Sequence, residues 1–346
     1  MDFVELNSDQ RREAVNSQQR FQAYQAAAAR RKSFRGSMVW STSRGNDYLL
    51  RVGYDKAGHR KQVSLGPRDE KTEATKAEFE RGREEAEQGL HAIQSAMTRQ
   101  AAVNRALGLG RVPSLSARIL RLIQASGLLG AHIRVVGTHA IYAYEAAAGV
   151  HIDAALTATG DLDLLLDARR RLSFVATEGV EEASLIRLLQ KVDKSFVRSN
   201  QTFRAVNDEG YLVDLVKPLR DPPWANEPAR IGADADDLSA VEIAGRSWLE
   251  SAPAFEATAI DERGQPLQII APDPRVFAVH KHWLSKQPDR EPIKRMRDAK
   301  QAQCVADLVT VYLPHLPFDA DDLRMLPKGL VDDAKPLFES NRPPAP

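Results

Sequence analysis

Three aspartates on short apolar segments are the residues of this sequence best placed to do chemistry. Asp161 and Asp163 are separated by one leucine, and because successive side chains of a strand alternate between its faces, both carboxylates would share a face. Two neighbouring carboxylates on an apolar strand repel each other and lose hydration, which is costly unless a cation lies between them. Asp214 lies in a later apolar segment, 51 positions after Asp163. This pattern points to a cation-binding cluster of carboxylates.

The alternative interpretation gives these side chains structural roles only. Asp161 would cap a turn, and Asp163 and Asp167 would lie on the surface. Asp214 would form an ion pair with Arg204. An isolated Asp-x-Asp is common, so the choice depends on the elements that position the three aspartates.

Periodicity and stop signals predict those elements. The apolar run Val135-Val136 ends at Gly137-Thr138, and a helix-forming segment then continues to Gly149, a residue that suits the left-handed end of a helix. The predicted order is strand, Gly-Thr turn, helix, loop and Asp-x-Asp strand. An amphipathic helix over 114–129 comes before it, and a hairpin over 201–218 follows and carries Asp214.

The chain before this core changes character twice. Residues 8–32 predict a helix capped by Ser8, and residues 36–66 predict a small antiparallel sheet of three strands. Residues 69–107 carry mixed, closely spaced charges, which are typical of an exposed helix. The segment is either one long helix or two helices in line, and we expect it to be a spacer between the sheet and the core.

The N-terminal region is locally basic. Between Arg11 and Arg68 there are 13 Lys or Arg and three acids, a net charge of +10, against +1 for the whole chain. Trp40, Tyr48 and Tyr54 are interleaved with these cations, and nucleic-acid surfaces use such a combination for stacking and phosphate contact. Alternatively, the aromatic rings are the only core that three strands can build, and the cations form its solvated face.

After the third aspartate the pattern predicts a loop over 219–250, a hairpin over 257–272 and helices over 274–286 and 289–313. In the last helix Asp298 shares a stripe with apolar residues, so it should face inward and have a partner.

Composition excludes several classes of protein. The 346 residues are 43% hydrophobic and 27% charged, which is ordinary for a soluble globular chain of two or three domains. The single Cys304 excludes a disulfide or a cysteine metal site within the monomer. No apolar run approaches the roughly 20 residues of a membrane helix, and the N-terminus lacks the apolar centre of a signal peptide. We therefore expect a cytoplasmic protein with no membrane partner.

Taken together, these elements resemble the DNA polymerase β-like nucleotidyltransferase superfamily. The wording VVGTHAIYAYEAAAGV followed by TGDLDLLLD is similar to a bacterial nucleotidyltransferase family within it. It is more distantly similar to the nucleotidyltransferase toxins of abortive-infection (type IV toxin–antitoxin) systems.

The fold expected is α/β (α+β), a polymerase beta-like nucleotidyltransferase core with a mixed sheet, a small N-terminal antiparallel β module and a C-terminal helical lobe. The expected divisions are 1–68 for the N-terminal helix and basic β module, 69–112 for a helical linker, 113–250 for the core and 251–346 for the hairpin and helical lobe.

The resemblance also implies roles for particular residues. Asp161, Asp163 and Asp214 would be catalytic and would bind two Mg²⁺ ions, because Mg²⁺ prefers hard oxygen ligands and nucleotidyl transfer needs its attacking and leaving oxygens held in line. Asp214 would also favour deprotonation of the acceptor hydroxyl. Gly137 and Thr138 would bind phosphate oxygens at a helix N-terminus.

In the toxin-like relatives, a lysine on one helix and an arginine–aspartate cluster on the next face the triphosphate. The matching nucleotide-binding positions here are Lys281, and Arg295 with Asp298. The sequence departs from the superfamily pattern in having Gly-Thr in place of Gly-Gly or Gly-Ser. Asp161 also follows Gly137 by 24 positions, which is longer than usual.

The function predicted is a Mg²⁺-dependent nucleotidyltransferase that moves a nucleoside monophosphate from a nucleoside triphosphate to an acceptor hydroxyl, with release of pyrophosphate. Two alternatives stand beside it. One is a nucleic-acid-binding protein whose nucleotidyltransferase fold is catalytically silent, and the other is a toxin-type enzyme that modifies tRNA. The expected partners are the nucleoside triphosphate and a nucleic-acid acceptor bound through the basic N-terminal module.

Overall fold

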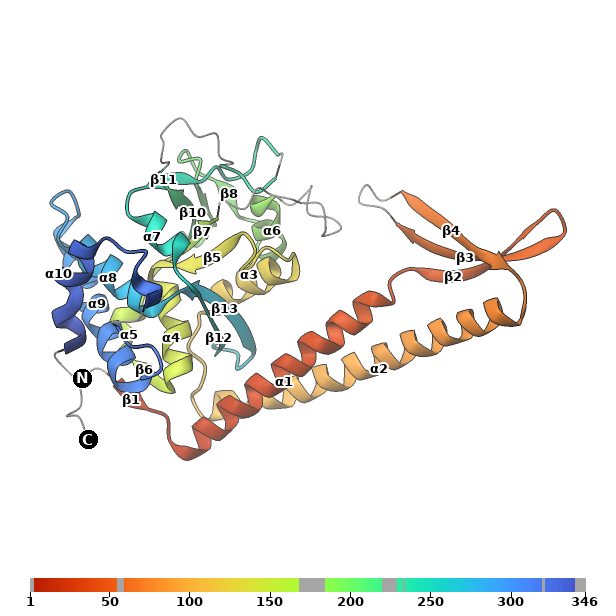
Figure 1. The fold of residues 1–346 in the computed structure, drawn as a ribbon, viewed down its shortest axis with the longest axis horizontal. Helices are drawn as coiled ribbons and strands as arrows, with labels where there is room; N and C mark the ends of the chain where they lie inside the picture. Colours follow the sequence, from red (N-terminus) through yellow and green to blue (C-terminus); the bar gives the residue numbers. More distant parts are fainter. Residues whose placement is uncertain are drawn as a thin grey trace.

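The computed structural model describes residues 3–54, 59–167, 184–219, 229–232, 234–318 and 321–339. Figure 1 shows a mixed α/β body from which a long arm of two helices extends, with a small sheet at the far end of the arm. None of the helices in the described parts of the chain combines the length and the apolar character needed to cross a bilayer.

Two helices that lie side by side form the arm: α1 (Ser8–Ser33) and α2 (Glu70–Ala106) (Figure 1). The helix predicted over 69–107 is therefore one continuous helix. The N-terminal cap of α1 is Asn7 and not the predicted Ser8. Asn7 Oδ1 accepts a hydrogen bond of 2.9 Å from the backbone N–H of Gln10, because the side chain one residue earlier is the one that reaches this free amide.

The sheet at the end of the arm is the predicted three-stranded antiparallel sheet. Leu49 and Val52 on its central strand are buried, and the Trp40 ring lies 5.0 Å from the Arg68 guanidinium. Tyr54 is 68% exposed. The sheet therefore uses some of its aromatic and apolar residues for packing and leaves Tyr54 on the surface. Its strands, in spatial order, are β2 (Ser37–Ser43), β3 (Asn46–Tyr54) and β4 (Arg60–Pro67).

A six-stranded mixed sheet forms the centre of the body. Its strands are β5 (Ile133–Val136), β7 (Asp161–Leu166), β8 (Val197–Arg198), β9 (Arg204–Val206), β10 (Leu212–Pro218) and β11 (Val241–Ile243). The order is β5-β7-β10-β9-β8, with β11 beside β10. β7 is antiparallel to β5 and parallel to β10, whereas β9 is antiparallel to β10, as the predicted hairpin requires.

The connection from β5 to β7 holds the residues between the glycine turn and the acidic strand. A 3₁₀ turn, η1 (Gly137–Ala140), leads into α4 (Ile141–Ala148), which ends at Gly149 with a left-handed φ of +66°, as predicted. The additional residues of this connection form β6 (Val150–Ile152) and α5 (Ala154–Thr157). β6 pairs with β1 (Phe3–Glu5), a strand that the sequence pattern did not predict.

The two faces of the central sheet pack against different helices. Leu162 and Leu164 belong to the main core, with residues of α3 (Ser114–Ala125), α4 and α6 (Leu185–Val192). Leu165 and Val216 belong to a second core beside the C-terminal elements. Asp161 and Asp163 share the face of Leu165, and Asp214 shares that of Val216, because side chains two residues apart lie on one face of a strand. The acidic residues therefore border the second core.

The C-terminal part of the chain supplies that second core. β11 and the helix Arg246–Ser251 (α7) overlap the segment predicted to be a loop, so that prediction is wrong over residues 241–243 and 246–250. A local pattern of three strand residues and six helical residues is too short to be recognised against proline- and acid-rich neighbours. The elements are α7 (Arg246–Ser251), the hairpin β12 (Ala254–Ile260) and β13 (Pro266–Pro272), α8 (Pro274–Ser285), α9 (Pro292–Tyr312), η2 (Asp321–Leu323) and α10 (Lys328–Glu339).

Candidate active site

Strand pairing brings the three aspartates together. β7 and β10 are parallel, with Asp214 opposite Asp163 and Leu212 opposite Asp161. Paired residues of neighbouring strands present their side chains on the same face, about 5 Å apart at the backbone. Asp214 is 6% exposed, and Asp161 and Asp163 are half-buried. The structure therefore places three carboxylates on one face of the central sheet.

The environment of Asp163 is electrostatically unusual. Loss of hydration raises its pKa from 3.8 to about 6, and the negative charges of Asp161 and Asp214 act in the same direction. Arg246 and Lys281 act in the opposite direction. Asp163 is half-buried, so its carboxyl group is surrounded by protein but not sealed from solvent. A carboxylate in such a position gains from a bound cation.

A glycine makes room for this carboxylate. Val136, the last residue of β5, is paired with Asp163, and the next residue is Gly137 with φ of +64°. A Cβ atom at Gly137 would lie 2.0 Å from Asp163 Oδ2. Only glycine allows the chain to turn into η1 directly against the carboxylate.

Thr138 is tied to the C-terminal lobe. Its hydroxyl oxygen accepts a hydrogen bond from the Arg297 guanidinium, and Gln301 Nε2 lies 3.3 Å away as a second donor. Thr138 is 5% exposed and Gln301 is fully buried. The turn that contacts Asp163 is therefore fixed to α9.

Arg204 pairs with the third aspartate. Its Nε and Nη2 atoms donate to the two carboxylate oxygens of Asp214 at 2.7 and 2.6 Å. This bidentate pair raises the pKa of Arg204, to which the charges of Asp161 and Asp163 also contribute. The ion pair considered as a structural alternative therefore forms, but it forms inside the acidic cluster and not away from it.

A group of cations faces the acids from the other side. Lys281 Nζ on α8 donates to Asp298 Oδ1 at 2.7 Å, and Arg290 Nε donates to Asp298 Oδ2 at 2.9 Å. Burial lowers the pKa of Lys281, and Asp298 opposes that shift. Arg246, at the start of α7, has its Nε buried without a hydrogen-bond partner among the described residues, and burial lowers its pKa while Asp163 raises it. Cationic side chains thus converge on the Asp163 carboxylate.

The arginine that meets Asp298 differs from the one expected. The predicted cluster joined Arg295 to Asp298, but Arg290, from the turn between α8 and α9, contacts Asp298 instead. Arg295 is half-buried, and its side chain has no hydrogen bond or ion pair within the described residues. The stripe on α9 correctly indicated that Asp298 faces inward, but periodicity within a helix does not show which side chain arrives from the preceding turn.

Sequence reasoning also missed Arg246, Arg290, Arg297 and Gln301. Arg297 and Gln301 are four residues apart on α9, next to the buried stripe, and this spacing is the one signal that could have indicated a polar pair facing the core. Arg246 lies in a helix that was predicted to be a loop.

A buried hydrogen-bond network supports the turn from beneath. Ser116 Oγ lies 2.8 Å from His139 Nε2 and 2.7 Å from the Tyr211 hydroxyl. Burial lowers the pKa of His139 to about 4, and Asp161, whose charge and backbone face the ring, opposes this shift. His139 is therefore neutral at pH 7. Tyr211 immediately precedes β10, so the network joins α3, η1 and the start of the strand that carries Asp214.

As the side chains stand, no group of three or more His, Cys, Asp or Glu residues in the described parts of the chain is arranged to hold a metal ion. At the acidic cluster, both oxygens of Asp214 accept hydrogen bonds from Arg204. The donor set itself fits a hard divalent cation: it consists of carboxylates, and Asp163 is destabilised by its two acidic neighbours.

Comparison with known proteins gives one match. Residues 114–326, more than half of the chain, match a family model described as Nucleotidyltransferase. The match begins at α3 and includes all three aspartates, the glycine turn, α8 and α9. The arm lies outside it. No curated protein and no solved structure matches the chain.

Proposed function

The chain belongs to the nucleotidyltransferase family and is a nucleotidyltransferase enzyme, and we propose that it transfers a nucleoside monophosphate from a nucleoside triphosphate to an acceptor hydroxyl in a Mg²⁺-dependent reaction that releases pyrophosphate. One observation carries the proposal: Asp163 and Asp214 are paired in register, on the face that Asp161 shares, with Gly137 against the Asp163 carboxylate. A carboxylate cluster beside a glycine turn and several cations suits this transfer.

We assign the acids to metal binding. Asp161 and Asp163 would hold the ions that bridge the triphosphate, and Asp214 would complete the second site of a pair. Two bound Mg²⁺ ions would supply electrostatic stabilisation of the attacking and leaving oxygens. Arg204 holds both carboxylate oxygens of Asp214 in this structure, so a cation bound there would compete with Arg204 for the carboxylate.

We assign the cations to the triphosphate. Three cations lie near Asp163 or its neighbours: Arg246 on α7, Lys281 on α8 and Arg290 in the turn after α8. Arg297 reaches the Thr138 hydroxyl at the glycine turn. Arg295 stays in the proposal as a nucleotide-binding residue, one that reaches phosphate only if its side chain turns toward the site. Positive groups at this position would balance the charge that develops on the leaving pyrophosphate.

The acceptor hydroxyl needs a base. Asp214 is the acid best placed for this, because it stands opposite Asp163 and is held by hydrogen bonds in a fixed orientation. The buried network of Ser116, His139 and Tyr211 keeps the turn and the strand in register, and His139 is neutral and enclosed, so we assign it a positioning role and not proton transfer.

At the level of fold, we propose a polymerase beta-like core. The mixed sheet with its antiparallel β5–β7 pair, parallel β7–β10 pair and glycine turn supports this proposal. We propose a division into residues 113–250 for the core, 251–346 for a lobe that contributes Lys281, Arg290, Arg295 and Arg297, and 1–68 with 69–112 for the arm.

The experiment that tests the function uses the full chain with each of the four nucleoside triphosphates, labelled on the α-phosphate. Total RNA in one arm and lysate protein in another serve as acceptors, each with Mg²⁺ and with EDTA. Mg²⁺-dependent transfer of label to a macromolecule is the expected result, and label found in tRNA would identify the toxin-type activity. Failure of all four nucleotides to label either pool, without pyrophosphate release, would contradict the proposal.

A further inference from the structure

A second site lies between the arm and the body. An open cavity of about 820 Å³ is bounded by α1 and α2 on the arm and by α3 and the β12–β13 turn on the body. This volume lies within the range of ligand sites. Neither the acidic cluster nor the cations around Asp163 line it, so it is distinct from the candidate active site.

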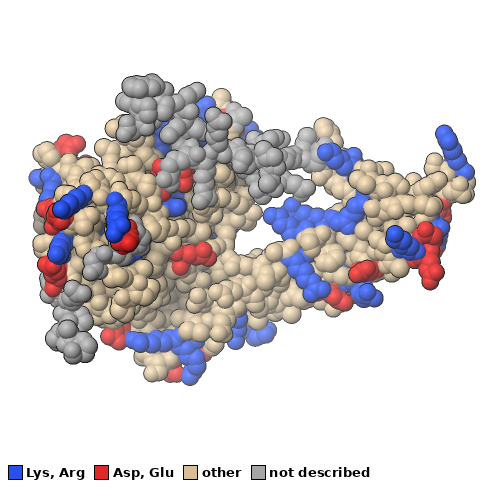
Figure 2. Space-filling view, viewed as in Figure 1, with Lys and Arg blue, Asp and Glu red and all other residues tan. Residues whose placement is uncertain are grey.

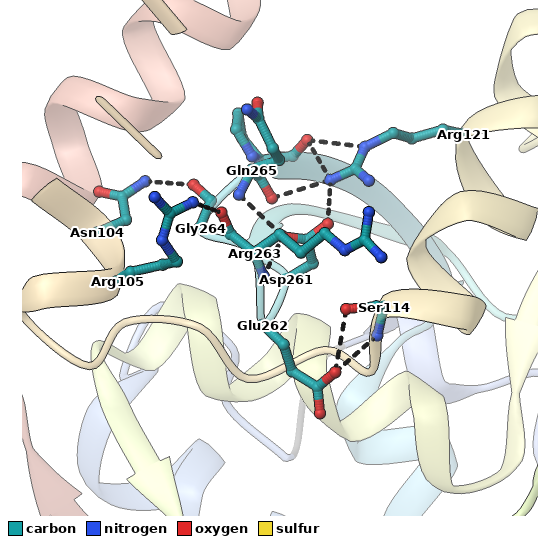
Figure 3. A network of polar contacts seen from close by, with 10 residues as sticks. Asn104, Arg105, Ser114, Arg121, Asp261, Glu262, Arg263, Gly264 and Gln265 are labelled. Atoms are coloured by element: carbon teal, nitrogen blue, oxygen red, sulfur yellow. Dashed lines mark hydrogen bonds and ion pairs between the residues drawn. The ribbon is translucent and has the colours of Figure 1, made fainter. Parts of the chain in front are cut away.

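The walls of this cavity are fixed to each other. Figure 3 shows the turn between β12 and β13 tied to both helices: Asn104 Nδ2 on α2 donates to the carbonyl oxygen of Gly264 at 2.8 Å, and Arg121 Nη2 on α3 donates to Asp261 Oδ2 at 2.8 Å. A Cβ atom at Gly264 would lie 2.1 Å from the carbonyl oxygen of Ala101, so the turn is pressed directly against α2. The cavity is therefore preformed, which reduces the cost of ordering a ligand in it.

The lining combines rings and cations without any acid. Phe21 and Tyr24 are stacked with centroids 6.3 Å apart, and Tyr24 is half-buried, so part of its ring faces the cavity. Arg31 and Lys32 follow about two helical turns later, and none of the lining residues is Asp or Glu. Arg31 is paired with Glu87, whereas Lys32 is exposed and has no ion pair within the described residues.

Basic side chains also border the cavity. Figure 2 shows Lys and Arg side chains gathered along the side of the arm that faces the body, across a hollow. The last turn of α1 carries Arg30, Arg31 and Lys32, of which Arg30 is paired with Glu85 and Arg31 with Glu87 on α2. Aromatic faces next to a positive edge suit single-stranded nucleic acids, since each base offers a ring to stack and each phosphate a charge to neutralise.

We propose that this cavity binds a single-stranded segment of a nucleic-acid acceptor, with a base against Tyr24 and the backbone phosphates along Arg31 and Lys32. The proposal rests on the proposed function, because it names the class of acceptor that the active site modifies. It shifts the acceptor site from the sheet at the end of the arm to the cavity between the arm and the body.

The test is a fluorescence-anisotropy titration of the full chain with a labelled single-stranded RNA of about 12 nucleotides and the DNA of the same sequence, at about 50 and 200 mM salt. Lys32→Glu and Tyr24→Ala are compared with Lys71→Glu, which makes the same charge change on an exposed residue of α2 outside the cavity. We expect the Kd to rise about tenfold or more in both cavity variants and to change less than about twofold in the control. Lys32→Glu should also flatten the salt dependence by about 0.7 in slope for each phosphate that the lysine neutralises in the wild type.

Equal affinity in wild type, Lys32→Glu and Tyr24→Ala, or no binding at the lower salt, would overturn this inference. Binding of Mg²⁺ and nucleoside triphosphate is measured on the same samples and should not change in the cavity variants. If the oligonucleotide-binding result contradicts this inference while nucleotide turnover is still observed, the proposed function is not affected. Conversely, Asp163→Asn should bind the oligonucleotide like the wild type, so loss of catalysis does not affect this result.

Discussion

The carboxylate of Asp163 lies where a side chain at residue 137 would begin. Gly137 has a φ of +64°, and a Cβ built on it would stand 2.0 Å from Asp163 Oδ2. One residue that lacks a side chain thus defines the position of the central acid, and the turn that follows it is the one held by Arg297.

Gly137→Ala should therefore displace Asp163. Gly149→Ala is a matched control, because Gly149 has nearly the same φ, +66°, and nothing lies within 4 Å of its Cβ position. Both variants should lose about 1–2 kcal/mol of stability from left-handed strain. Only Gly137→Ala should also reduce transfer, by on the order of 100-fold, since small misplacements of reacting groups have effects of that size. Equal activity in the two variants would show that contact with Asp163 does not matter.

The raised pKa of Asp163 predicts how stability depends on pH. Its pKa rises from 3.8 to about 6 on folding, so the folded state binds the extra proton and stability falls as pH rises through this window. Asp163→Asn should remove this pH-dependent loss of stability. Without metal, at a pH of about 7.5, it should be more stable than wild type by about 1–3 kcal/mol. The difference should shrink as pH falls from about 6 toward 3.8. Urea unfolding at several pH values measures it, and a difference that does not change with pH would contradict the assignment.

Arg204 and a metal ion should compete for Asp214. Arg204→Gln removes the bidentate partner, so the apo protein should lose about 1–3 kcal/mol of stability and Mg²⁺ should restore more of it than in wild type. Arg187→Gln is the control, because Arg187 pairs with Asp234 at 3.0 Å and is 67% exposed. Thermal unfolding with and without Mg²⁺ is the measurement. If Mg²⁺ shifts the Tm of all three proteins equally, Asp214 does not bind metal in competition with Arg204.

Lys281→Ala should weaken nucleotide binding. Lys281 is buried and its charge acts on Asp163, so its loss should raise the Kd for a nucleoside triphosphate about tenfold or more. Arg295→Ala should have a smaller effect, because Asp298 is held by Arg290. Lys286→Ala, whose lysine pairs with the exposed Asp333 at 2.6 Å, is the control. Unchanged affinity in Lys281→Ala and Arg295→Ala would return both to a structural role.

The features of the site that depend on local sequence patterns could be predicted from the sequence. Alternation along β7 placed Asp161 and Asp163 on one face, and the hairpin turn at Asp208–Gly210 led to Asp214. Gly149 ends its helix with the expected left-handed φ. Each of these follows from a period or a turn within about ten residues of chain, which sequence alone contains.

The remaining part depends on packing between distant segments. Arg246 and Arg290 reach acidic side chains from α7 and from a turn, and Arg297 reaches Thr138 from α9. No local pattern says where such helices will lie. The arm could not be recognised either: the sequence predicts a helix before the small sheet and another after it, and only the structure shows that α1 and α2 lie side by side (Figure 1). The strand Phe3–Glu5 is too short for its alternation to be seen, and it forms because Val150–Ile152 offers it an edge.

The role of the acidic cluster is tested most directly by comparing pyrophosphate release by wild type and Asp163→Asn. The reactions contain Mg²⁺, total RNA and the nucleoside triphosphate that the wild type uses. Asp208→Asn makes the same substitution at an exposed residue of the turn before β10 and serves as the control. We expect release by wild type and by Asp208→Asn, and a loss of at least about 1,000-fold in Asp163→Asn, because removal of a metal-binding carboxylate removes transition-state stabilisation. Release by Asp163→Asn at the wild-type rate would contradict the assignment of Asp163 to catalysis.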